Sequence, residues 1–192
     1  MGTRGVMGVR IDRKDKIGYQ QFDSYPSGVG VAVVGDIKKM LSDGGIEKMK
    51  GLARALRVVS NRTPPTKVEK IVLKQYADLD VSKQSPDDWY CLLRKNQGML
   101  EQTLLSGYVE DHQDFLLDSL FCEWGYIVNL DKETFEIYKG FQHEPHNLGR
   151  YSGRKGKKRN HHHSEYYSCA LIKVYPLRDI PENWVKEVDP EE

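Results

Sequence analysis

The chain has no long hydrophobic run. None of its apolar stretches approaches the roughly 18 residues that a membrane-spanning helix needs. The first four residues, Met1-Gly2-Thr3-Arg4, are not followed by the apolar core of a signal peptide. We therefore expect a soluble, cytoplasmic protein with no membrane partner.

Cysteine and net charge are also scarce. The three cysteines, Cys91, Cys122 and Cys169, are odd in number and widely spaced in apolar surroundings, which favours buried, reduced thiols over a disulfide framework. With 29 Lys and Arg against 28 Asp and Glu, the total charge does not indicate a nucleic-acid or membrane partner. The uneven placement of the charges is more informative than their sum.

A complete metal, phosphate-loop or triad signature is missing as well. Histidines occur at 143, 146 and 161–163, but the triplet is contiguous and a proline separates His143 from His146. This spacing does not fit a tetrahedral metal centre. The sequence therefore predicts no metal site and no cofactor.

The N-terminal segment of the chain, in contrast, carries clear strand patterns. Residues 3–12 and 16–22 are rich enough in β-branched and aromatic residues to form two strands, joined by a charged turn at 13–15. The period of two places Met7, Val9 and Ile11 on one face, and Arg4, Val6, Gly8 and Arg10 on the other. An antiparallel hairpin is the expected structure.

The hairpin leads into F-D-S-Y-P-S-G-V-G, residues 22–30. Pro26 fixes one backbone dihedral, and the glycines permit positive ones. The turn would display Asp23, Ser24, Tyr25 and Ser27 just before a helix N-terminus, where backbone N–H groups attract anions. Ordinary turn and capping chemistry explains the same residues, and both interpretations stay open.

The rest of the chain alternates helical and strand patterns. Apolar residues recur at helical spacing in 29–41 and 46–58, T-K-V-E at 66–69 has the form of a capping box, and S-P-D-D at 85–88 resembles a helix start. Strands are expected at 124–130, 134–139 and 166–175. We predict a single α+β domain over 1–192, with a mainly antiparallel sheet of about five strands and helices inserted between them.

A candidate pocket combines aromatic and charged residues. It would place Arg4 beside planar rings, an arrangement suited to stacking a base and pairing a phosphate or carboxylate. Tryptophans in a small domain are usually core residues, which is the competing interpretation. Glu123 stands at the entry to a buried strand and should have a partner, for which Arg4 and Arg10 are candidates. The predicted lining residues are Arg4, Asp23, Ser24, Tyr25, Trp89, Tyr90, Glu123 and Tyr126.

Residues 149–164 form a glycine-rich basic stretch with six Lys or Arg and no acid. We expect a loop that attracts phosphate from a nucleotide or a nucleic acid, or else a solvated loop balanced by the acidic tail at 179–192. The charged residues expected to take part are Arg154, Lys155, Lys157, Lys158 and Arg159.

Two resemblances accompany these patterns. T-R-G at 3–5, F-D-S-Y-P-S-G-V-G at 22–30, Q-S-P-D-D-W-Y-C-L-L-R at 84–94 and L-F-C-E-W-G-Y-I-V-N-L-D at 120–131 resemble a family of small bacterial and phage proteins that has no settled activity. That resemblance implies a role in a mobile element, such as sequestering a host signalling nucleotide. Relatives often carry Asn-His or His-His where this chain has Gln20-Gln21, so no acid-base or metal role is implied there.

A weaker resemblance is to N-terminal-nucleophile hydrolases, which also open on a strand hairpin. Their chemistry needs a nucleophile at residue one, so Thr3 would have to be exposed by processing. Asp23 and Glu123 are the other catalytic candidates, as a carboxylate pair.

We predict binding of a small anionic, nucleotide-like ligand. The alternatives are an amidohydrolase acting through Thr3, or a protein-interaction module. The sequence leaves a homo-oligomer open.

Overall fold

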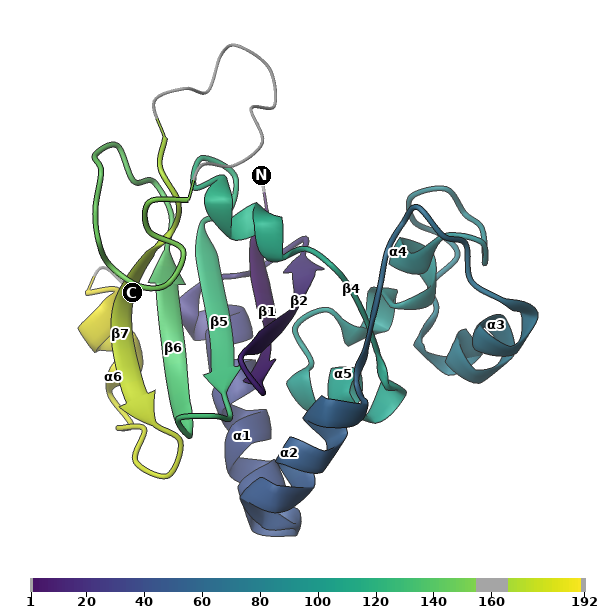
Figure 1. The fold of residues 1–192 in the computed structure, drawn as a ribbon, viewed down its shortest axis with the longest axis horizontal. Helices are drawn as coiled ribbons and strands as arrows, with labels where there is room; N and C mark the ends of the chain where they lie inside the picture. Colours follow the sequence, from purple (N-terminus) through teal and green to yellow (C-terminus); the bar gives the residue numbers. More distant parts are fainter. Residues whose placement is uncertain (1, 155–165, 191–192) are drawn as a thin grey trace.

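The structure is a computed structural model that describes residues 2–154 and 166–190. Its main element is a five-stranded sheet in the order β2-β1-β5-β6-β7 (Figure 1). The strands are β1 (Gly5–Ile11), β2 (Lys14–Gln20), β5 (Trp124–Asn129), β6 (Thr134–Lys139) and β7 (Ala170–Pro176).

The sheet is mixed. β1–β2, β5–β6 and β6–β7 pair antiparallel, as expected, but β1 and β5 pair parallel, with Gly5 opposite Trp124 and Arg10 opposite Asn129. The expectation of an α+β fold with about five strands is confirmed, and the sheet is mixed rather than purely antiparallel. A parallel pair needs a long crossover, and residues 12–123 supply it.

Helices cover one face of the sheet. A π-helical turn at Pro26–Gly30 leads into α1 (Val31–Asp43), which is followed by α2 (Gly45–Ala55), α5 (Leu100–Ser106) and α6 (Trp184–Val188). Their buried side chains form the main core with Met7, Val9 and Ile11, so the predicted alternation of β1 is confirmed. Helix α6 lies within the segment expected as an acidic tail, and its Trp184 ring meets Phe135 edge-on at 5.8 Å.

The second face carries a smaller core under the short helix η4 (Gln113–Leu117) and the segment after β6. Val6, Ile17, Ile127 and Tyr138 pack there against Leu116 and Tyr151. Cys122 and Cys169 are buried in the same cluster, and all three cysteines of the chain are free thiols, as expected.

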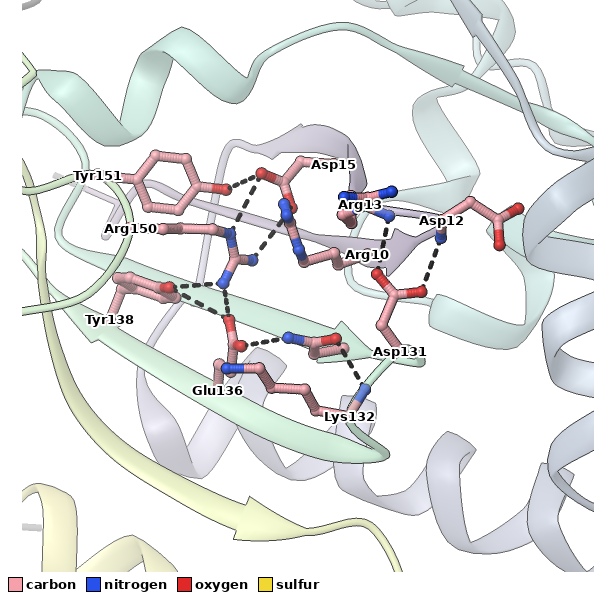
Figure 2. Close-up of polar contacts among 11 residues, drawn as sticks. Arg10, Asp12, Arg13, Asp15, Asp131, Lys132, Glu136, Tyr138, Arg150 and Tyr151 are labelled. Atoms are coloured by element: carbon pink, nitrogen blue, oxygen red, sulfur yellow. Dashed lines mark hydrogen bonds and ion pairs between the residues drawn. The ribbon is translucent and has the colours of Figure 1, made fainter.

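A cluster of charged residues continues this second face toward the hairpin (Figure 2). Asp15 accepts hydrogen bonds from Arg10 Nη1 at 3.0 Å, Arg150 Nη2 at 3.1 Å and the Tyr151 hydroxyl at 2.9 Å. Arg150 also pairs with Glu136, whose other oxygen accepts from Asn129 Nδ2 at 2.7 Å. Arg150 thus fastens the segment after β6 to the sheet.

The hairpin turn is tighter than predicted. Asp12 and Arg13 are its two loop residues, both at positive φ, and Lys14 and Asp15 belong to β2 rather than to the turn. The backbone N–H groups of Asp12 and Arg13 donate to the Asp131 carboxylate at 2.7 and 2.8 Å (Figure 2). Asp131, in the β5–β6 turn, therefore fixes a conformation that non-glycine residues rarely adopt.

Residues 57–110 form a lobe beside β2, on the side of the sheet away from β7 (Figure 1). The lobe contains β3 (Arg57–Val59), α3 (Lys67–Leu73), η2 (Lys74–Tyr76), α4 (Trp89–Leu92), η3 (Arg94–Asn96) and β4 (Tyr108–Glu110), together with α5. β3 and β4 form a separate parallel pair. Leu73, Trp89, Leu92 and Leu93 make its own small core.

The capping box of Thr66 and Glu69 is confirmed, but two predicted helix bounds in this region are wrong. Residues 57–58 belong to β3, because α2 ends at Ala55. The helix expected to start at Ser85 starts at Trp89 instead, and Asp88 is its N-cap. The Ser85 hydroxyl accepts a hydrogen bond from the Asp87 N–H in the preceding turn. Across residues 2–154 and 166–190, no helix combines the length and the apolar character required to cross a bilayer.

The Asp15 cluster yields a stability prediction. Asp15→Asn should lower the free energy of unfolding by about 3 kcal/mol, because it leaves two partly buried guanidinium groups without the charge of the buried carboxylate that they share. Burial raises the pKa of Asp15, but its bonds with Arg150, Arg10 and Tyr151 outweigh this, and the net pKa is lowered. The stabilisation is therefore present above the ordinary aspartate pKa and lost as pH falls through the lowered one.

Urea denaturation at neutral and acidic pH measures both effects. Asp12→Asn is the matched control in the same hairpin, because the Asp12 side chain is in an exposed ion pair with Arg54 and its replacement should change stability by less than about 1 kcal/mol. Equal losses in the two variants would show that the buried cluster does not stabilise the fold.

Candidate ligand pocket

A small pocket lies between the edge strand β2 and the lobe. It encloses about 40 Å³. Gly18, Tyr19 and Gln20 of β2 line one side, and Tyr90, Glu110 and His112 line the other. A cavity of this size admits several water-sized groups but not a whole nucleotide, so only one end of a larger ligand would enter it.

Two glycines shape this pocket. A side chain at Gly18 would place its Cβ 3.0 Å from Val109 Cγ2, so the missing side chain lets β4 approach β2. Gly98 has φ +78°, which turns the chain from η3 into α5. A Cβ there would lie 4.0 Å from Gln20 Oε1, so this turn passes beside the pocket.

Gln20 is the most unusual residue of the pocket. Its side chain is 2% exposed, and its Oε1 has no hydrogen-bond partner among the described residues. Buried side-chain acceptors are nearly always bonded, and leaving one without a partner costs about 1–3 kcal/mol. The pocket thus holds an acceptor with no partner in the described part of the chain, which can receive a hydrogen bond from a ligand.

Glu110 brings a second polar group to the same space. Burial raises the pKa of its carboxyl; nearby His112 opposes the shift and Asp88 adds to it. The His112 ring is tilted by 40° against the Tyr19 ring, with ring centres 5.6 Å apart, and its Nδ1 lies 3.2 Å from the Glu110 carbonyl oxygen. A carboxyl with a raised pKa can keep its proton closer to neutral pH and then act as a donor as well as an acceptor.

Aromatic rings and two arginines surround the pocket residues. Tyr19 and Tyr90 lie with their ring centres 6.4 Å apart, and the Arg94 guanidinium lies 5.8 Å from the centre of the Tyr90 ring. Arg94 Nη1 also donates to Gln97 Oε1 at 2.6 Å. Burial raises the pKa of Tyr19, and the positive charge of neighbouring Arg4 partly offsets the rise. The region beside the rings therefore carries positive charge.

The structure places two of the predicted residues side by side and a third, Tyr90, in the pocket wall. Arg4 and Glu123 are neighbours: Glu123 N donates to the Arg4 carbonyl at 2.9 Å, and Arg4 N lies 3.4 Å from Glu123 Oε1. Arg4 was one of the two expected partners of Glu123, but the contact comes from its backbone amide and not from its side chain. The Arg4 guanidinium lies over the Phe121 ring, and Tyr90 lines the pocket.

Other predicted residues are placed elsewhere. Trp89 belongs to the lobe core, where its Nε1 donates to the Thr63 carbonyl at 2.7 Å. Tyr126 is buried in the main core and donates its hydroxyl to the Ser24 carbonyl at 2.8 Å. Ser24 is buried, whereas Asp23 and Tyr25 are exposed on the turn.

Thr3 is buried, and its carbonyl accepts the Ser24 N–H at 3.1 Å. The Arg154 guanidinium lies 5.7 Å from the centre of the Tyr151 ring. Lys155, Lys157, Lys158 and Arg159, as well as the histidines at 161–163, lie outside the described residues. Within the described part of the chain, no group of three His, Cys, Asp or Glu residues could hold a metal ion.

Sequence reasoning missed Tyr19, Gln20, Arg94, Glu110 and His112. The one local indication of these residues is Y-V-E-D-H at 108–112, which places a glutamate and a histidine close to the buried Val109. The strand there has only three residues. The pairing of this strand with β3 and its approach to β2 are long-range features.

No family model, curated protein or solved structure matches the chain.

Glu110 makes the stability of the fold depend on pH. Because its folded pKa is raised above the ordinary value, wild-type protein loses stability as pH rises from the ordinary glutamate pKa through the raised one. Glu110→Gln removes this loss, so the melting temperature of the variant relative to wild type should increase between about pH 4.5 and pH 8.

Thermal unfolding of both proteins across that range tests the expectation. Glu182→Gln, on an exposed stretch before α6, is the control for loss of a carboxylate and should show no such trend. A difference in melting temperature between Glu110→Gln and wild type that stays constant with pH would contradict the raised pKa.

Proposed function

We propose that the chain binds a small anionic ligand that carries a planar polar group, such as a nucleotide, in the pocket between β2 and the lobe. The observation that carries the proposal is the buried Oε1 of Gln20, which has no hydrogen-bond partner within residues 2–154 and 166–190. A base edge or an amide that donates an N–H group to this oxygen would remove its desolvation penalty.

The surroundings of Gln20 suit such a ligand. Glu110 offers a second hydrogen-bonding group in the same cavity. Tyr19 and Tyr90 offer ring faces on which a planar group can stack, an interaction worth about 1–3 kcal/mol per base. Since the enclosed volume is small, the anionic part of the ligand would remain outside, near Arg4 and Arg94, whose guanidinium groups pair well with phosphate.

Binding without turnover would suit the sequestration of a signalling nucleotide. To test binding, purified protein is incubated with mono-, di- and cyclic nucleotides while the melting temperature and the nucleotide masses are recorded. A bound ligand raises the melting temperature by mass action. An unchanged nucleotide mass would indicate binding alone, whereas a changed mass would indicate an enzyme.

Gln20→Leu separates the role of Gln20 in binding from its effect on stability. The variant should bind the stabilising nucleotide at least tenfold more weakly, a loss of about 1.4 kcal/mol. Without ligand it should be more stable than wild type by about 1 kcal/mol, because the unpartnered carbonyl is gone. Isothermal titration calorimetry and urea denaturation measure the two quantities.

Thr134→Val is the matched control. Thr134, in β6, also has a buried oxygen without a partner, but it does not line the pocket. Its replacement should stabilise the protein and leave affinity unchanged. The proposal fails if no nucleotide shifts the melting temperature at millimolar concentration, or if Gln20→Leu binds as tightly as wild type.

A further inference from the structure

Helix α3 exposes a row of large apolar side chains. Val68, Ile71 and Val72 are 68%, 74% and 48% exposed. They follow one another at i, i+3 and i+4, so they share one side of the helix. Figure 1 shows α3 at the end of the lobe farthest from the sheet. Single exposed apolar residues are common, but a contiguous group of β-branched ones indicates an interaction surface.

The orientation of this helix is fixed by its other side. Leu73 is fully buried in the lobe core with Trp89 and Leu92. Glu69 is buried as well, where it completes the capping box with Thr66 and pairs with Arg57 at 3.2 Å. These contacts hold the apolar row outward, so its exposure is a property of the folded helix.

Positive charge borders the row. Lys67 and Lys74 lie four residues before and three residues after Ile71, on the same side of the helix. Neither forms an ion pair with a described residue, whereas Lys70 pairs with Asp87. Over residues 57–76 the chain has five Lys or Arg and only one acid. The surface is therefore an apolar centre with an unpaired cation at each end.

We propose that this surface, Val68, Ile71 and Val72 with Lys67 and Lys74, docks an acidic amphipathic segment of a partner protein. Apolar side chains of the partner would cover Ile71, and its carboxylates would pair with the two lysines. A second copy of the chain fits less well, because a two-fold pairing of α3 brings lysine against lysine. The proposal is independent of the nucleotide pocket.

The experiment uses labelled helical peptides with leucine at helical spacing and glutamate elsewhere, together with matched peptides that carry lysine in place of glutamate. Fluorescence anisotropy should show that the full-length protein binds the acidic peptides at least tenfold more tightly than the basic ones. Ile71→Asp should weaken this binding at least tenfold. The Lys67→Glu, Lys74→Glu double variant should do the same, whereas Lys67→Arg, Lys74→Arg should retain binding.

Leu105→Asp is the matched control, since Leu105 is an equally exposed apolar residue on α5, outside the proposed surface. It should bind as wild type does, and all variants should keep the wild-type circular dichroism. The proposal is overturned if acidic peptides do not bind at millimolar concentration, if basic peptides bind equally well, or if Ile71→Asp binds normally. A dimer, or binding to phosphatidylserine vesicles, that is abolished by Ile71→Asp without peptide binding would assign the surface to self-association or to a membrane instead.

Discussion

The parallel pairing of β1 with β5 is the constraint on which the rest of the structure depends. β1 is paired on both edges, and Val6 and Val9 are fully buried on opposite faces of the sheet. This pairing joins the N-terminal hairpin to a strand more than a hundred residues later and sets Arg4 beside Glu123. It also leaves β2 as an edge strand, and the lobe packs against that edge. The pocket exists because β1 takes the position next to β5 and β2 does not.

The cluster around Arg150 and the pocket beside β2 differ in how far their polar groups are hydrogen-bonded. In the cluster around Arg150, each carboxylate meets donors at hydrogen-bond distance, and burial raises the pKa of Tyr138 and Tyr151, which keeps both phenols protonated. Such a satisfied network holds the chain in place. The pocket instead contains an acceptor without a donor and a carboxyl with a raised pKa. Buried polar groups without partners and shifted pKa values are more frequent at functional sites than elsewhere, which supports the proposal of a binding pocket.

Sequence patterns predicted the features of the fold that depend on neighbouring residues in the chain. The alternation along β1 and the capping box at Thr66 follow from the period of a strand and from side-chain hydrogen bonding. The hairpin turn was misplaced because Asp12 and Arg13 adopt positive φ only with the help of Asp131, over a hundred residues away. β3 and β4 have three residues each, too few for a periodic signal, and no pattern distinguishes parallel from antiparallel pairing of β1 and β5.

In the candidate site, too, some features could be predicted from the sequence and others depend on long-range contacts. The adjacency of Arg4 and Glu123 was foreseen, since a carboxylate entering a buried strand needs a donor. The tryptophans could not be assigned from composition, and Trp89 proved to be a core residue of the lobe. Gln20 and Glu110 meet only because the lobe folds back on β2, which depends on the close approach at Gly18.

That same lobe core connects the two proposed surfaces. Leu73 of α3 packs in one cluster with Leu93, which lines the pocket, and with Tyr108 beside it. A ligand at Gln20 and a partner on α3 would therefore both bind beside elements that share this small group of packed side chains. Contact alone does not make the two sites cooperative, because coupling requires the lobe to have a second arrangement that each ligand favours differently. Such an arrangement would alter the bonds between the lobe and the segment that follows β2, among them the one from Gln21 N to Gln97 Oε1 at 3.0 Å.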